Sequence, residues 1–569
     1  MRTPPEHATR LIRSRYYLGN AFIVEHNPGT AQVSASGILL LPPLGYEDTC
    51  AYRPLRVLAD ALARAGHVVL RLDWPSLGDS AFEASRVDLV ASGTSAIASA
   101  IASLHARGFA RITGIGVRGG GLMALASPGF DELALWGVPL SGKAYLREER
   151  AFHQTAARAY GEVPKDIAPL PDGALEAGGF FYSPETVAAL QGLSAKALVT
   201  AGKLRRALLI GRDGIAAPAE LVDAFRKAGT AISISSANGL SALLENSYQS
   251  ELRPGIFEAI QTWLATGSGR VDNRGPEGQG SLRLEAGVTE RPVVLSGEAG
   301  ELSGILCEPE GGAKPGAAWM LFLNAGGIRR SGPNRLWTRT ARALAAEGRP
   351  SLRFDVRDVG DSDGATAAHP DLEEMYSESA IRDVVQAYDW ALAQGAGEMD
   401  VVGLCSGSFL GIQLAARRQI RRAMLFNGLA FVWDDEARAS GVTSHIGESL
   451  FDGRRWRRLL TGRINAAAVV NAIGAKAWMV AARPFRQRRE VNAVQTLIHD
   501  VTARGTTLHL VSSEGDPSAA YLERNVDPEF RPRMTMLPGV DHTIRPLWAH
   551  DRVVALIMNG HDFLPTKGP

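Results

Sequence analysis

Short apolar runs alternate with longer amphipathic segments along most of this chain. In its second half, apolar runs bounded by turn residues predict strands at 318–326, 350–356, 399–405, 421–428, 506–513 and 533–539. Between them apolar residues recur at helical spacing, most clearly at 335–348. An antiparallel pair within 284–309 is expected to open the sheet. Strands that alternate with helices are typical of a doubly wound, mostly parallel sheet.

The chain contains two copies of this pattern. Residues 55–80 align without gaps on residues 337–362, so that Arg71, Asp73, Gly78, Asp79 and Ser80 recur as Arg353, Asp355, Gly360, Asp361 and Ser362. In both copies an apolar strand precedes the aligned segment, and a glycine-containing segment follows it, at 112–121 and 401–411. We therefore expect two tandem α/β domains, at 1–267 and 283–569, joined by a polar linker at 268–282.

Composition narrows the classes of function. A net charge of +1 gives no field for nucleic acid or a charged membrane. The three cysteines, Cys50, Cys307 and Cys405, form neither a disulfide framework nor a zinc-binding pattern. The N-terminus lacks the apolar core of a signal peptide, and no apolar run reaches membrane-spanning length. We expect a cytoplasmic protein that uses no metal and no cofactor and has no membrane span.

The segment 401–411 has the pattern of a nucleophile on a tight strand-to-helix turn. Such a turn needs small residues two positions before and two positions after the nucleophile. Around Cys405 these positions are Gly403 and Gly407, whereas around Ser406 they would include Leu404, which would collide with the turn. The pattern therefore favours Cys405 as the nucleophile. A buried, inert cysteine beside a helix start is the alternative.

An acid and a histidine follow at the ends of the next two strands. The strand at 506–513 runs into Glu514 and Asp516, and the strand at 533–539 runs into Asp541 and His542. Loops at the carboxyl ends of parallel strands are where such sheets place their functional residues. The hypothesis is a triad of Cys405, Asp516 and His542. Glu514 is the second choice for the acid, and Asp541 is less favoured because sequence neighbours rarely point at each other.

Both copies resemble the α/β-hydrolase fold, and the second resembles the serine-aminopeptidase-type and thioesterase-like hydrolases of that superfamily. The resemblance lies in LNAGG (323–327), RFDVRDVGDS (353–362), GLCSGS (403–408), SSEGDP (512–517) and GVDHT (539–543). Cysteine replaces the commoner serine, as it does in dienelactone-hydrolase-like members. The resemblance implies an oxyanion hole formed by the N–H of Ser406 and that of Ala325 or Gly326, with Asn324 bracing the loop.

An insertion at about 430–500 is expected to form a helical lid. It is rich in arginine, including Arg454, Arg455, Arg457 and Arg458, and has no acidic residue from 453 to 489. These arginines form either a solvated face or a binding site for an anionic group. Such a group would belong to an acyl carrier protein's phosphopantetheine, a coenzyme A thioester or an acidic glycan.

The first copy lacks the catalytic residues. Its nucleophile position holds Arg118, its acid position Asp213, and its histidine position Tyr248. Arginine stays protonated and cannot attack a carbonyl, so we expect an inactive domain in which Arg118 and Asp213 form a buried ion pair. The sequence as a whole predicts a cysteine-dependent hydrolase or acyltransferase acting on an ester or thioester. A non-catalytic tandem scaffold that binds a ligand or partner is the alternative.

Overall fold

The N-terminal half forms one eight-stranded sheet. The computed structural model describes residues 11–265, 269–364, 372–433 and 493–560. The second strand is antiparallel to the strands on either side of it, and all other pairs of neighbouring strands in this sheet are parallel. In sheet order the strands are β1 (Ile12–Leu18), β2 (Ala21–Asn27), β5 (Val69–Leu72), β4 (Ser36–Leu41), β6 (Arg111–Val117), β7 (Glu132–Trp136), β10 (Arg206–Ile210) and β11 (Ala231–Ser235).

The C-terminal half repeats this sheet with one extra edge strand. The predicted antiparallel pair that opens the sheet is present, and the six predicted parallel strands follow it. In sheet order the strands are β13 (Leu282–Leu284), β14 (Val288–Gly297), β15 (Gly300–Pro309), β17 (Ser351–Phe354), β16 (Trp319–Phe322), β18 (Met399–Leu404), β19 (Arg422–Phe426), β20 (Thr507–Ser513) and β21 (Arg533–Leu537).

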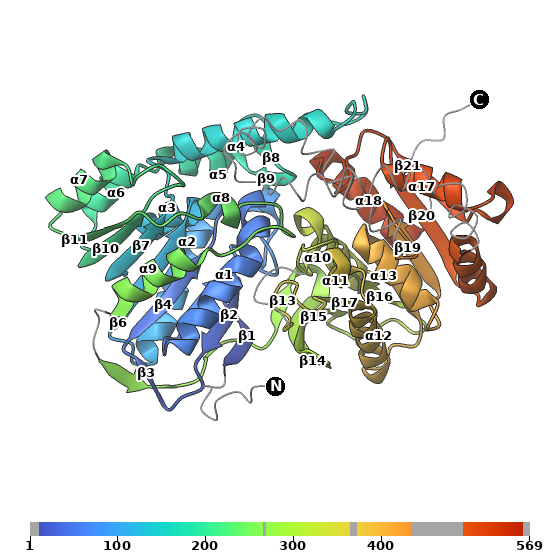
Figure 1. Cartoon of the computed structure of the whole chain (residues 1–569), viewed down its shortest axis with the longest axis horizontal. Helices are drawn as coiled ribbons and strands as arrows, with labels where there is room; N and C mark the ends of the chain where they lie inside the picture. The colour runs from blue at the N-terminus through green and yellow to red at the C-terminus, as the bar shows by residue number, and fades with distance from the viewer. Residues whose placement is uncertain (1–10, 266–268, 365–371, 434–492, 561–569) are drawn as a thin grey trace, which may run out of the picture.

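The two sheets share one topology. Numbered along the chain, and leaving β13 aside, both have the strand order 1-2-4-3-5-6-7-8. Helices cover both faces of each sheet (Figure 1). In the first half they are α1 (Tyr46–Arg64), α2 (Leu89–Ala106), α3 (Gly119–Ala126), α4 (Gly142–Ala156), α5 (Pro184–Gly192), α6 (Ala195–Ala201), α7 (Ala219–Lys227), α8 (Leu240–Leu243) and α9 (Pro254–Ala265). In the second half they include α10 (Leu336–Ala346), α11 (Leu372–Met375), α12 (Glu378–Ala393), α13 (Ser406–Ala415), α17 (Pro517–Asn525) and α18 (Leu547–Asn559).

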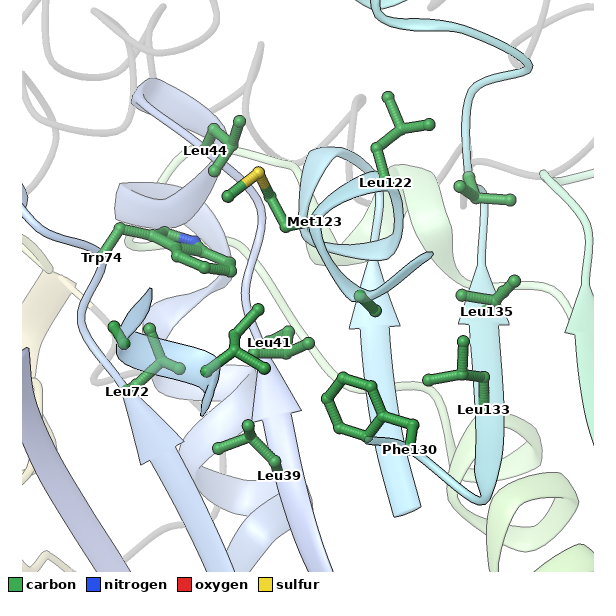
Figure 2. Packing of buried hydrophobic residues seen from close by; sticks show 14 of the residues in the cluster. Leu39, Leu41, Leu44, Leu72, Trp74, Leu122, Met123, Phe130, Leu133 and Leu135 are labelled. Atoms are coloured by element: carbon green, nitrogen blue, oxygen red, sulfur yellow. The ribbon is translucent and has the colours of Figure 1, made fainter. Parts of the chain in front are cut away.

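Each sheet has an apolar core on both faces. Alternate residues of β4 divide between them, because side chains of a strand point alternately to opposite sides. Leu39 and Leu41 join one cluster, and Ile38 and Leu40 join the other. Figure 2 shows the first cluster, in which Met123 of α3 lies beside Trp74 and Leu44. The tandem α/β architecture predicted from the strand pattern is therefore the observed one.

The two domains meet through a reciprocal network of buried ion pairs. Arg71 of the first domain pairs with Asp361 of the second, and the equivalent Arg353 of the second pairs with Asp79 of the first at 2.7 Å. Arg330 joins both sides, because it lies 2.8 Å from Asp79 and 2.9 Å from Asp361. This pattern, in which each copy presents the same residues to the other, is that of a two-fold symmetric dimer interface, here formed within one chain.

The segment between the domains is not free of regular structure. β12 (Arg270–Asp272) pairs with β3 (Gln32–Ser34) of the first domain. Gln279 exchanges two backbone hydrogen bonds of 2.9 Å with Tyr17. The segment expected to be a linker at 268–282 is therefore held along the first domain, and its last residue, Leu282, begins β13.

One helix within the described residues is long and apolar enough to cross a membrane. It is α2, with 18 residues, of which 39% are buried inside the protein. The expectation that the chain has no membrane span stays a prediction. Length and composition are weak evidence for a span, since the core helix of a globular domain meets the same criterion. Ile97, Ala100 and Leu104 of α2 are buried in the core of the first domain.

Candidate active site

Cys405 occupies a strained turn between β18 and α13. Its backbone has φ 56° and ψ −116°, a conformation that few residues other than glycine adopt. A Cβ on Gly403 would lie 2.1 Å from the Gly407 carbonyl oxygen, and one on Gly407 would lie 2.6 Å from that of Asn324. The turn therefore requires glycine at both positions. The neighbouring Ser406 is the first residue of α13, so Cys405 is the residue at the apex.

His542 and Asp516 come to this turn from two other loops. The imidazole Nδ1 of His542 lies 2.6 Å from Asp516 Oδ2, and the His542 side chain also forms a hydrogen bond with the Cys405 thiol. The second carboxylate oxygen of Asp516 accepts the Ser518 N–H at 2.9 Å, at the start of α17. The structure thus brings together three residues that are far apart in sequence. Cys405 and Asp516 are 111 positions apart, and Asp516 and His542 are 26 positions apart.

The other two acids predicted near this site have different partners. Asp541 pairs with Arg545 at 2.7 Å and accepts the Thr543 hydroxyl at 3.0 Å. Glu514 is exposed and accepts the Gly539 N–H at 3.3 Å. Neither carboxylate contacts His542 through a hydrogen bond among the described contacts, so the geometry favours Asp516.

The electrostatics of the three residues favour a thiolate–imidazolium pair. Burial opposes ionisation of Cys405, but the charge and hydrogen bond of His542, the Ser406 N–H and the Tyr376 hydroxyl together lower the pKa of the thiol. Burial likewise opposes the charge on His542, but Cys405 and Asp516 raise the pKa of the imidazole well above its ordinary value. Burial would raise the pKa of Asp516, but the hydrogen bond with His542 lowers it.

Both domains have the α/β-hydrolase fold.

This assignment rests on the strand order and on where the site residues lie. In the second domain Cys405 follows the fifth strand of the order, Asp516 the seventh and His542 the eighth, which is the chain order of nucleophile, acid and histidine in that fold. In the first domain the equivalent of Cys405 is Arg118, which has the same backbone conformation, φ 52° and ψ −120°. The same turn conformation is therefore present in the first domain, where arginine occupies the position of Cys405.

Several solved structures are similar to this chain. An α/β serine hydrolase homologue from Coxiella burnetii shares 12% identity, with 48% of this chain and 96% of that chain covered and a TM-score of 0.30. A dienelactone hydrolase from Anabaena variabilis shares 14% identity, covering 48% and 96%, with a TM-score of 0.29. An acetyl xylan esterase from Paenibacillus sp. R4 shares 14% identity, covering 49% and 87%, with a TM-score of 0.30. Neither the models of known protein families nor the sequences of curated proteins match this chain.

The predicted oxyanion loop differs from expectation in one respect. The Gly326 N–H, one of the two candidate donors beside Ser406, donates to the Ser406 hydroxyl at 2.9 Å and is therefore occupied. Ala325 lies on the same tight turn, where its carbonyl accepts the Ile328 N–H at 3.1 Å. Asn324 braces this turn, because its amide donates to the Ile328 carbonyl at 3.0 Å and its oxygen accepts the Val356 N–H at 2.9 Å.

Two residues of the site were not found from the sequence. Tyr376, between α11 and α12, forms a hydrogen bond with the Cys405 thiol and stacks on Trp433 at 4.1 Å between ring centroids. Asn427, after β19, donates to the His542 carbonyl at 2.7 Å and so fixes the loop that carries the imidazole. Nothing in the spacing near Tyr376 signals its role. The signal for Asn427 was available, since it is a polar residue at the carboxyl end of a strand next to β18.

A pocket of about 550 Å³ is lined in part by Tyr376, the residue that forms a hydrogen bond with the Cys405 thiol. The apolar side chains that line it include those of Tyr376, Ile381, Phe409 and Trp433, and the polar ones are Glu373, Glu374, Ser377, Glu378 and Gln413. Tyr376 therefore contacts both the pocket and the Cys405 thiol. The arginines Arg454, Arg455, Arg457 and Arg458, and most of the expected lid at 430–500, lie outside the described residues.

The first domain does not contain the predicted ion pair. Arg118 binds Glu47 at 2.9 Å and Glu148 at 2.6 Å, not Asp213. The Asp213 carboxylate instead accepts backbone N–H groups at the start of α8, including that of Ser241 at 2.7 Å. The prediction was wrong because it paired Arg118 only with the residue at the acid position of a triad. The long arginine side chain instead reaches Glu47 on α1 and Glu148 on α4.

Tyr248, at the histidine position of the first copy, faces the second domain. It is half-buried and packs against the core cluster of that domain. Beside it the Ser247 carbonyl approaches Gly327 so closely that a Cβ there would lie 2.5 Å from the oxygen. The segment at Ser247 and Tyr248 therefore contacts the second domain at Gly327. Among the described residues no group of three or more His, Cys, Asp or Glu side chains could hold a metal ion.

Proposed function

We propose that the second domain is a cysteine-dependent acyl hydrolase or acyltransferase that acts on an ester or thioester. The observation that carries the proposal is the assembly at Cys405: a strained elbow, a hydrogen bond between Cys405 and His542, and the 2.6 Å contact of His542 with Asp516. A thiolate held beside an imidazolium and a helix N-terminus is an activated nucleophile.

The proposed reaction has two stages. The Cys405 sulfur attacks the carbonyl carbon of the substrate, and the oxyanion binds the Ser406 N–H at the start of α13. The imidazolium of His542 then gives its proton to the leaving alkoxide or thiolate, and a thioester acyl-enzyme remains. In the second stage His542 removes a proton from water or an acceptor, which attacks the thioester and releases Cys405.

The shape of the pocket supports an apolar acyl group. The rings of Tyr376, Phe409 and Trp433 form the aromatic part of a lining that also holds Glu373, Glu374 and Glu378, and Tyr376 links this pocket to the Cys405 thiol. A volume of about 550 Å³ is within the usual range for small-molecule sites. Burial of such a group against these rings would hold its carbonyl near Cys405. A carrier-protein or coenzyme A thioester remains the proposed source of the acyl group, because a thioester intermediate exchanges readily with thiols and amines.

The test is covalent trapping, read by intact mass. A panel of acyl thioesters and aryl esters should add one acyl group to the wild-type chain and none to Cys405→Ala. Cys50→Ala is the matched control, because Cys50 is 2% exposed and burial raises the pKa of its thiol above the ordinary value. An adduct that survives in Cys405→Ala, or iodoacetamide labelling that is equally slow at all three cysteines, would favour a non-catalytic scaffold.

A further inference from the structure

The histidine of the proposed triad lies on a segment that the first domain contacts on both sides. This segment connects β21 to α18 and carries His542 at its centre. Three residues before His542, the Gly539 carbonyl accepts the Gly161 N–H at 3.3 Å. Five residues after His542, the Leu547 N–H donates to the Glu176 carboxylate at 3.0 Å. Both partners belong to the first domain, more than 350 positions away.

Glu176 acts as the missing cap of α18. The cap residue of that helix is Pro546, whose side chain makes no capping hydrogen bond. The first N–H groups of a helix have no partner within the helix. Glu176, on the short strand β8 (Leu175–Ala177), provides the acceptor from the other domain. Figure 1 places β8 and its partner β9 (Phe180–Tyr182) between the first sheet and α18.

The contact at Gly161 leaves no room for a side chain. A Cβ on Gly161 would lie 2.6 Å from the Gly539 Cα, and one on Gly539 would lie 2.7 Å from the Glu162 carbonyl oxygen. At the turn between β8 and β9, a Cβ on Gly179 would lie 2.6 Å from the Arg545 carbonyl oxygen. Backbone thus touches backbone on both sides of His542, so the position of this segment depends on the first domain.

We propose that Glu176 and Gly161 are positioning residues for His542, and that the inactive domain is required for an assembled triad. The proposal rests on the proposed function. His542 must meet both Asp516 and Cys405 at hydrogen-bond distance, and Asn427 holds its carbonyl only from the second-domain side. Small displacements of a catalytic group, on the order of 1 Å, lower rates by about 10²-fold.

The experiment measures the rate of Cys405 alkylation by iodoacetamide as a function of pH, without any substrate. The variants are Glu176→Ala, Glu176→Gln and Gly161→Ala in the full chain. Gly192→Ala is the control for Gly161→Ala, since a Cβ there meets nothing within 4 Å and neither glycine has a positive φ. Turnover of whichever substrate acylates the wild type is measured in parallel, as kcat and KM separately.

We expect Glu176→Ala and Gly161→Ala to shift the inflection of the alkylation profile upward, toward an ordinary thiol, and to lower kcat about 10-fold or more with KM little changed. Glu176→Gln keeps an acceptor for the Leu547 N–H and should restore the wild-type profile. A merely structural role would lower the melting temperature and leave the thiol pKa in place.

Two different results would contradict the positioning role, and only one of them would also contradict the proposed function. A wild-type Cys405 that titrates as an ordinary thiol would overturn the proposed function and the positioning role with it. A low thiol pKa in the wild type that is unchanged in both Glu176→Ala and Gly161→Ala would overturn the positioning role alone. If Gly161→Ala does not fold, the comparison of Glu176→Ala with Glu176→Gln still decides.

Discussion

Replacing Asp79 with asparagine tests whether the reciprocal ion pairs hold the two domains together. Asp79 is fully buried and lies 2.7 Å from Arg353 and 2.8 Å from Arg330. Asparagine has nearly the same shape, so the substitution removes the charge without opening a cavity. It leaves two buried guanidinium groups with one carboxylate fewer.

The expected loss of stability depends on which carboxylates remain beside Arg353 and Arg330 in the variant. Breaking a buried ion pair costs about 3–5 kcal/mol, because one charge remains buried without its partner. Here Arg353 retains Glu290 at 2.5 Å, and Arg330 retains Asp355 at 2.7 Å. We therefore expect the lower end, about 3 kcal/mol. For domains of this size that corresponds to a fall of ~6–12 °C in Tm.

The assay is urea unfolding followed by tryptophan fluorescence at neutral pH. Asp223→Asn is the control, since Asp223 and its partner Arg226 are 60% and 65% exposed and such pairs contribute only about 0–1 kcal/mol. By the pseudo-symmetry of the interface, Asp361→Asn should destabilise the protein at least as much as Asp79→Asn. A loss of less than about 1 kcal/mol for Asp79→Asn would refute the reasoning, since that is the range of an exposed pair.

The same variant has a predictable pH dependence. Burial alone would raise the pKa of Asp79, but the charges of Arg330 and Arg353 lower it below the ordinary value. A carboxylate with a lowered folded-state pKa stabilises the protein above its unfolded pKa, about 3.9. That contribution disappears as the pH falls through the folded value. The difference in stability between wild type and Asp79→Asn should therefore shrink in acid.

Three further predictions concern the two elbows. Tyr376→Phe removes only the hydroxyl that hydrogen-bonds Cys405, so the inflection of the thiol alkylation profile should rise while the fold persists, which circular dichroism checks. Arg118→Met should destabilise the first domain by about 2–3 kcal/mol in urea unfolding, because it leaves the partly buried Glu47 without its hydrogen-bonded cation; an unchanged midpoint would contradict this. Turnover by the second domain should fall at alkaline pH, as the raised pKa of His542 is passed and the proton for the leaving group is lost; a pH–rate profile that rises without limit would argue against the imidazolium.

Much of this protein was determined by short stretches of sequence. The alternation of apolar and amphipathic segments predicted the strands of the second sheet, and the aligned Arg71 and Arg353 segments predicted the duplication. Cys405 was distinguished from Ser406 by local sterics, since only small residues fit two positions away on a tight turn. These features depend on residues within a few positions of each other, where backbone geometry and side-chain volume set the outcome.

Only the tertiary structure decided which distant side chains meet. Arg118 reaches Glu47 and not the predicted Asp213, because a flexible side chain pairs with whichever carboxylate the packing of helices brings near. The hydroxyl of Tyr376 beside the thiol, and the Glu176 carboxylate that caps α18 from the other domain, had no signal in spacing or periodicity. Contacts between residues hundreds of positions apart depend on how whole sheets and domains pack, and that arrangement is a property of the folded chain.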